Sequence, residues 1–129
     1  SDLASTVLST VISHREASNR LVIDAGALAL SKDRSTSGQT IDTGYGLIAD
    51  GRTGQLIEGL RIDSVHQEHG EVISLGTMPW EALPIGATVR VLPNHICMTA
   101  AMYDRYAIID GDDAVHGFAE RVNGWRADR

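Results

Sequence analysis

The chain has 129 residues, 43% of them apolar, so we expect one domain (residues 1–129) whose core needs no disulfide or structural metal. A formal net charge of −6 and scattered arginines argue against nucleic-acid binding, which needs a concentrated basic surface. With no apolar run of about 20 residues, no signal-peptide pattern and one cysteine, we expect a cytoplasmic domain outside the membrane and without internal disulfides.

Short β-prone runs separated by glycine, aspartate and proline predict a mainly β domain. The alternation is clearest in residues 87–92, where Val89 and Val91 share one face and polar residues occupy the other. Dense turn signals divide the runs at the spacing of a compact β-barrel or sandwich-like domain. The expected strands lie at residues 7–14, 21–24, 46–48, 56–62, 71–75, 88–92, 106–110 and 114–122.

One short helix is expected after the segment PNHIC, over residues 98–103, because these residues include good helix formers. Asn94 is the candidate cap of this helix. Residues 31–43 are polar and weakly patterned, which predicts a mobile loop.

The segment PNHIC places His95 and the only cysteine, Cys97, two positions apart after a predicted strand. In an extended chain both side chains would face one point, and imidazole and thiolate are good ligands for zinc or another divalent metal. Spacing alone favours a simpler arrangement, a packed cysteine beside a hydrogen-bonded histidine. A nucleophilic cysteine with its base is a third reading, although such histidines are usually distant in sequence.

A second polar segment, VHQEHG, contains two histidines and a carboxylate within four residues. These residues suit metal binding or acid–base chemistry near neutral pH, and a solvated turn closed by Gly70 is the alternative. In a strand, His66 and Glu68 would share one face and His69 would lie on the other. The segment therefore contributes Glu68 and His69 as candidate cleft residues.

Two further sets of residues have a structural and a functional reading. Asp24 ends a predicted strand before a glycine, where it either caps a turn or orients a group in a cleft. Tyr45, Tyr103 and Tyr106 are possible acid–base residues, but partly buried tyrosines with satisfied hydroxyls are the more common case.

The segments LVIDAGALALSKD, HQEHGEV, LPIGATVRVLPNHICMTAAMYD and GFAERVNGW resemble the C-terminal domain of the D-serine dehydratase and D-threonine aldolase-like family. The resemblance runs over essentially the whole chain, and PNHxC is its most specific part. Members are fold-type III pyridoxal-phosphate enzymes related to alanine racemase, in which an N-terminal TIM-like barrel carries the cofactor and its lysine. The resemblance implies that His95 and Cys97 bind a divalent metal, zinc in the dehydratases, beside that cofactor.

The resemblance also implies an activity for the parent protein, the elimination of water from a small D-3-hydroxy amino acid to give a keto acid and ammonia. Aldolase members tend to have an aspartate at the second ligand position, so Cys97 favours the dehydratase branch over retro-aldol cleavage. The sequence departs from the family at Leu28, where a lysine is common, and at Gln67, where an acidic residue is common. These departures leave Asp24, Glu68 and His69 as cleft candidates only.

The only lysine, Lys32, lies in a polar segment without a glycine-rich phosphate turn, so we expect the Schiff-base lysine outside this chain. The start at Ser1, without methionine and close to a core strand, suggests a fragment whose N-terminal barrel is missing and which is inactive alone. The family further implies a homodimer. A stand-alone β-domain that binds metal or a partner without catalysis is the alternative, and a cysteine hydrolase is a distant third reading.

Overall fold

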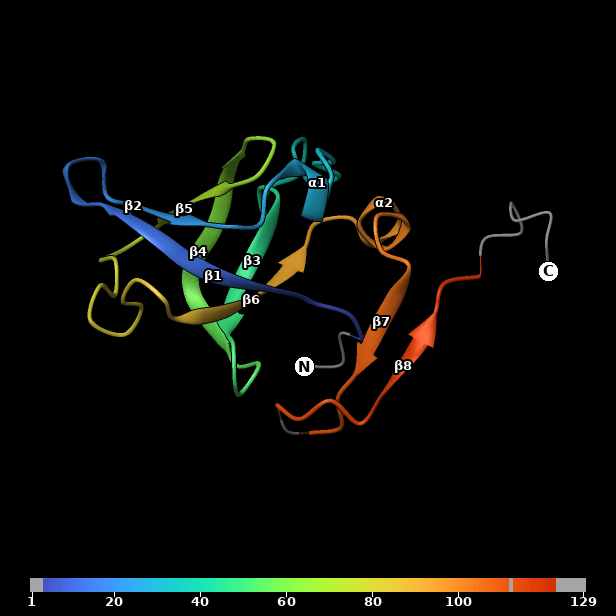
Figure 1. Cartoon of the computed structure of the whole chain (residues 1–129). Coiled ribbons are helices and arrows are strands. Elements are labelled where there is room, and N and C mark those ends of the chain that lie inside the picture. The colour runs from blue at the N-terminus through green and yellow to red at the C-terminus, as the bar shows by residue number, and fades with distance from the viewer. Residues whose placement is uncertain (1–3, 112, 123–129) are drawn as a thin grey trace.

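Six antiparallel strands close into a barrel in the order β1-β2-β5-β4-β3-β6 (Figure 1). The computed structural model describes residues 4–111 and 113–122. The mainly β prediction is confirmed, and the barrel is the alternative that the structure adopts. The barrel strands are β1 (Val7–Arg15), β2 (Arg20–Ile23), β3 (Gly46–Asp50), β4 (Leu56–Val65), β5 (Gly70–Ser74) and β6 (Thr88–Pro93).

Alternating apolar residues of these strands fill the barrel interior. Val89 and Val91 are buried and Thr88 is exposed, so the face predicted for β6 is confirmed. The cluster is completed by side chains from the other five barrel strands and from the loop between β5 and β6, including Val11, Leu21, Ile23, Ile48, Leu60, Ile62, Val72, Met78 and Leu83. This closed core holds the strand ends, and the loops that leave them, in fixed positions.

Irregular pairing lets the sheet curve enough to close. The register shifts between Val11 and Ser13 in β1, between Leu47 and Ala49 in β3, and in β4 beside Ile62. Shifts of this kind are typical of β-bulges, which increase local twist and bend a strand. The barrel is closed by β1 against β6, with Val7 opposite Val91.

Residues 4–111 and 113–122 contain two short α-helices where one was predicted. Helix α2 (Ile96–Ala101) is the expected helix, displaced by two residues, and it begins after His95, so the prediction that Asn94 caps it is wrong. Helix α1 (Ala27–Leu30), a single turn, and the 3₁₀ turn η1 (Glu16–Ser18) were not predicted from the sequence. Of the helices in residues 4–111 and 113–122, none is long and apolar enough to cross a membrane.

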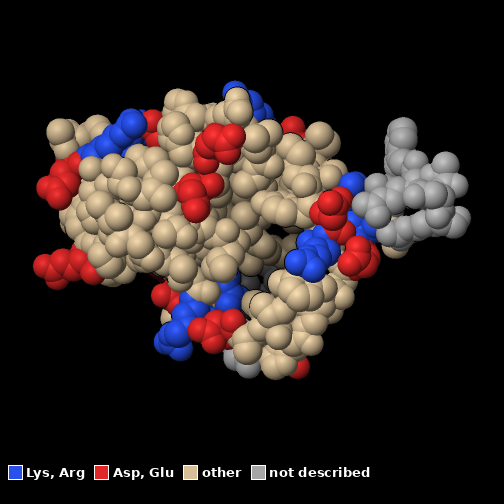
Figure 2. Space-filling view, viewed as in Figure 1, with Lys and Arg blue, Asp and Glu red and all other residues tan. Residues whose placement is uncertain are grey.

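The last two described strands form a separate hairpin that lies beside the barrel beyond α2 (Figure 1). Strands β7 (Arg105–Ile108) and β8 (Gly117–Glu120) are shorter than the predicted runs, because the described residues between them, 109–111 and 113–116, belong to neither strand. The end of the segment GFAERVNGW, residues 123–125, lies outside the described residues. A cleft of about 580 Å³ separates residues 4–8 from residues 103–109, and Figure 2 shows the surface hollowed there. The hairpin therefore leaves much of its surface uncovered.

Candidate functional site

His95 lies at the junction of β6 and α2, where it is held by a carboxylate from another part of the chain. Its Nδ1 is 2.8 Å from Oδ2 of Asp33, and both side chains are about two-fifths exposed. A histidine whose Nδ1–H donates to a carboxylate has a fixed ring orientation and presents Nε2 to a ligand. The pair therefore has the arrangement typical of a metal-binding histidine and its supporting carboxylate.

Cys97 lies in the first turn of α2 and is exposed. The packed-pair reading, which spacing alone favoured, needs a buried thiol and is not supported by this position. The extended geometry assumed for the two residues is also wrong, because the backbone is extended at His95 (φ −137°, ψ 115°) but helical from Ile96 onward. The buried member of α2 is instead Thr99, whose hydroxyl donates to the carbonyl of Leu30 at 2.9 Å and so ties α2 to α1.

Asn94 fastens the preceding polar loop to this junction. Its Nδ2 lies 2.7 Å from Oγ1 of Thr36, 2.9 Å from Oγ1 of Thr43 and 2.7 Å from the carbonyl oxygen of Gly44. Its Oδ1 accepts a hydrogen bond of 2.9 Å from the backbone N–H of Ser35. The residue predicted to cap a helix thus anchors the loop that carries Asp33.

The loop 31–43 contains no helix or strand, as predicted, but side-chain hydrogen bonds organise it. Asp42 is paired with Arg34, and the pKa of its carboxyl is lowered, first by the backbone N–H of Gly44 and also by Thr36 and Arg34. At the start of the loop the Ser31 hydroxyl accepts a hydrogen bond from the N–H of Asp33 at 3.1 Å. These bonds fix the path of the loop on both sides of Asp33.

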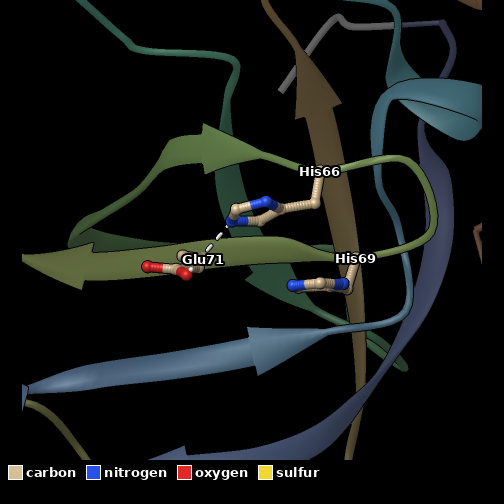
Figure 3. Close-up of side chains that lie close together, drawn as sticks. All are labelled: His66, His69 and Glu71. Atoms are coloured by element: carbon tan, nitrogen blue, oxygen red, sulfur yellow. Dashed lines mark hydrogen bonds and ion pairs between the residues drawn. The ribbon is translucent and has the colours of Figure 1, made fainter.

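A second group of candidate ligands surrounds the turn between β4 and β5. His66, His69 and Glu71 each offer one ligand atom, and these atoms all lie within 4.8 Å of one another (Figure 3). The segment is a turn and not a strand, so His66 shares a face with His69, contrary to the predicted pairing with Glu68. Glu68 is exposed at the turn, where its carboxylate accepts a hydrogen bond of 3.3 Å from the Gln67 side chain.

The remaining candidates have structural partners. Oδ1 of Asp24 accepts hydrogen bonds of 2.7 Å from the Ser9 hydroxyl and from the N–H of Thr10, which joins the end of β2 to β1. Tyr103 donates to the carbonyl of Ala29 at 3.1 Å, and burial raises the pKa of its phenol. Tyr106 donates to the carbonyl of Ala100 at 2.9 Å, and Tyr45 lies under the Arg34 guanidinium at 5.5 Å. A role for Asp24 in a cleft stays a prediction.

The structure thus pairs His95 with Asp33 and groups His66 and His69 with Glu71, and it leaves Cys97 exposed beside the first of these sets. Asp33 was missed from the sequence, because 62 positions separate it from His95 and no local pattern joins them. Glu71 was not among the candidate ligands predicted from the sequence, although strand alternation places it on the same face as His69. The chain is therefore a small antiparallel β-barrel domain with exposed imidazole, thiol and carboxylate groups around its loops.

Comparison with known proteins identifies the family. The chain belongs to the serine dehydratase domain family, since the family model described as "Putative serine dehydratase domain" matches residues 4–109. The D-threo-3-hydroxyaspartate dehydratase of Delftia sp. (strain HT23) is 36% identical over 129 residues, 96% of this chain and 33% of that protein. The D-serine dehydratase of Dictyostelium discoideum is 31% identical over 119 residues, 88% of this chain and 29% of that protein. The resemblance inferred from sequence is confirmed.

The chain spans only about a third of the length of these two dehydratases. A shorter relative, an uncharacterized protein of Mycobacterium tuberculosis, is 31% identical over 111 residues, 84% of this chain and 74% of that protein. The solved Delftia dehydratase superposes with a TM-score of 0.86 at 35% identity, covering 96% of this chain and 33% of that one. Two other structures of a D-threo-3-hydroxyaspartate dehydratase each carry one substitution. In one a histidine is replaced by alanine, and in the other a cysteine two positions further along is replaced by alanine. The cysteine variant is in a metal-free form.

Proposed function

We propose that this chain is the C-terminal metal-binding domain of a pyridoxal-phosphate- and metal-dependent lyase that eliminates water from a small D-3-hydroxy amino acid. The family and the two dehydratase relatives support this reaction class. D-Serine and D-threo-3-hydroxyaspartate are the first substrates to test, because the relatives are named for them. Retro-aldol cleavage by the same parent protein is the alternative reaction.

One observation carries the metal assignment, the contact of 2.8 Å between Asp33 and Nδ1 of His95. It orients the ring and leaves Nε2 for a metal, while the exposed thiol of Cys97 lies two residues along the chain. Nitrogen and sulfur donors suit zinc, and two protein ligands leave positions open for substrate. The substituted histidine and cysteine of the D-threo-3-hydroxyaspartate dehydratase have the same spacing, which supports the assignment.

The residues of the site have separate tasks. His95 and Cys97 would hold the metal, Asp33 orients His95, and Asn94 fixes the loop that carries Asp33. A divalent metal held there would supply a Lewis acid for the β-hydroxyl oxygen that leaves the substrate.

Pyridoxal phosphate does not fit the described part of this chain. Lys32, the only lysine, is exposed in the loop after α1, whereas a Schiff-base lysine needs a buried pocket beside its cofactor. We therefore assign the cofactor to the N-terminal barrel of the parent protein.

Exposed apolar side chains support a partner for this surface. Met98 in α2, Ile108 in β7 and Phe118 in β8 are each about half exposed, and the β7–β8 hairpin forms no backbone pairing with the other described strands. The N-terminal barrel and a second copy of the parent protein are the proposed partners. A non-catalytic stand-alone domain is the second candidate function, favoured by the Mycobacterium relative, of which this chain matches 74%.

The metal assignment can be tested with cobalt(II), because a cobalt–thiolate bond gives a near-ultraviolet absorption band that nitrogen and oxygen ligands do not give. We expect this band on the purified chain, its loss in Cys97→Ala, and its retention in Met98→Ala, which alters the neighbouring exposed sulfur side chain. His95→Ala should weaken cobalt binding at the same site. A band that persists in Cys97→Ala, or no band in the folded chain and in the parent protein, would refute the assignment.

The reaction is tested separately on the parent protein. We expect keto acid from D-serine or D-threo-3-hydroxyaspartate, and its loss in the Cys97→Ala variant. Aldehyde formed from D-threonine without keto acid would favour the aldolase alternative. A parent protein without lyase activity that still binds cobalt through Cys97 would favour the non-catalytic domain.

A further inference from the structure

The turn between β4 and β5 places three potential metal ligands on one face of a hairpin. Val65 pairs with Gly70, and the N–H of His66 donates to the carbonyl of His69 at 2.8 Å, so the two histidines face each other across a two-residue turn. Side chains of directly opposed residues lie on the same face, and Glu71 shares that face because it follows His69 by two positions in β5. The hairpin therefore groups all three side chains.

The side chains themselves are close enough to share one ion. The imidazole rings of His66 and His69 stack with centroids 4.4 Å apart and an interplanar angle of 19°. Nε2 of His66 is 3.2 Å from Oε1 of Glu71, and Figure 3 shows both rings directed along the hairpin toward that carboxylate. Two imidazoles and one carboxylate form a three-ligand zinc set that leaves a fourth position open.

The backbone beneath the ligands is fixed by α1. The N–H groups of Ala27 and Leu28 donate to the carbonyls of His66 at 2.7 Å and Gln67 at 3.2 Å. Gly26 makes this approach possible, since a Cβ atom there would lie 2.4 Å from the backbone nitrogen of His69. Only side-chain rotation is needed to bring the ligand atoms onto a metal, and this keeps the entropic cost of binding low.

The charges around Glu71 decide which cation fits. Oε1 lies 3.2 Å from Nη1 of Arg15, and Oε2 lies 3.3 Å from Nη1 of Arg20. These arginines disfavour hard cations such as Ca²⁺ and Mg²⁺, which need several oxygen ligands. A metal that bonds to imidazole nitrogen depends less on the carboxylate, and Arg15, whose side chain is 53% exposed, can move away from Oε1.

We propose that His66, His69 and Glu71 form a second metal site, selective for zinc-class divalent ions, on the outer wall of the barrel. The side chain of Glu71 points outward because its neighbour Val72 is buried in the core. The site uses none of the ligands of the His95 and Cys97 centre, and the inference stands independently of the proposed lyase function.

Zinc titration of the Cys97→Ala variant isolates this site from the thiol-containing centre. We expect isothermal titration calorimetry to show one zinc bound per chain, with histidine ring NMR signals that shift for His66 and His69. His69→Ala should weaken zinc at least tenfold, and Glu71→Gln severalfold. His116→Ala, a matched exposed histidine in the β7–β8 connection, should leave the affinity unchanged.

Arg15, which competes with a metal for Oε1 of Glu71, offers a variant that should strengthen zinc binding. Arg15→Gln should tighten zinc binding severalfold, because it frees Oε1 of Glu71, whereas a purely structural role for the cluster predicts no gain. Circular dichroism establishes that each variant is folded, and the NMR titration of the Cys97→Ala protein needs no further substitution. Equal zinc affinity in His69→Ala, or no zinc-dependent shift of either histidine, would overturn the proposal.

Discussion

Replacing Asn94 by alanine should unfasten the polar loop from the barrel and lower stability without touching the core. The amide makes contacts of 2.7–2.9 Å with Thr36, Thr43 and Gly44 through Nδ2 and with Ser35 through Oδ1. Two N–H donors and one acceptor amount to about three good hydrogen bonds, each worth roughly 0.5–1.5 kcal/mol. Because the side chain is half-buried, we expect a loss of about 2–3 kcal/mol in the free energy of unfolding.

Urea unfolding followed by circular dichroism measures this loss. Gln39→Ala is the matched control, since Gln39 has an exposed side chain in the same loop and should change stability by no more than about 0.5 kcal/mol. The variant Asn94→Asp distinguishes a role of Asn94 in this hydrogen-bond network from a role as a helix cap. Aspartate is as good a cap as asparagine, but here its carboxylate would face the carbonyl of Gly44, so we expect a loss comparable to that of Asn94→Ala.

Two results would refute the reasoning. If Asn94→Ala were as stable as the wild type, the hydrogen bonds to the loop would contribute nothing net. If Asn94→Asp retained full stability while Asn94→Ala lost it, the side chain would act as a cap, contrary to the geometry. The same variants should bind cobalt more weakly at Cys97, because the loop also positions Asp33.

Three other perturbations test the loop and the turn. Gly26→Ala should lower the free energy of unfolding by about 3 kcal/mol in urea, because the new Cβ would lie 2.4–2.7 Å from backbone atoms of the β4–β5 turn. An unchanged free energy of unfolding would contradict the tight packing of α1 on this turn. Asp33→Ala should weaken cobalt at the thiolate-containing site about 10–100-fold, and unchanged titration curves would show that His95 needs no support. Because the pKa of Asp42 is lowered in the folded state, its carboxylate contributes stability that is present above about pH 4 and is lost as the pH falls toward the folded-state pKa. Asp42→Asn should therefore flatten the curve of unfolding free energy against pH below about pH 4. An unchanged slope in urea unfolding would contradict this role of Asp42.

The strands were predictable because their signal is local. Alternation in residues 87–92 identifies a strand with one buried face, and glycine- and aspartate-rich turns bound the other runs. Barrel closure was not predictable, since β1 and β6 are about 80 residues apart and the sequence does not record which strands pair. Helix α1 was not predicted because its first two N–H groups donate to carbonyls of the β4–β5 turn and not to a local cap.

The sites show the same division between local and distant information. The pair His95 and Cys97 stands out in one short segment, whereas the partner Asp33 comes from a loop far away in sequence. In the segment VHQEHG, strand periodicity gave the wrong facing pair, because the chain reverses between His66 and His69. A turn reading of the same residues places the two histidines opposite each other and leads directly to Glu71.

The pairing of the first barrel strand with the last has a consequence for the order of folding. One edge of β1 stays unpaired until β6 has formed, so the ring of hydrogen bonds closes only when residues 88–93 are available. Contacts between residues so distant in sequence slow folding, because the long intervening chain must first be ordered. His95 and Cys97 follow immediately after that final strand. During synthesis, the segment that carries them therefore leaves the ribosome directly behind the strand that completes the barrel.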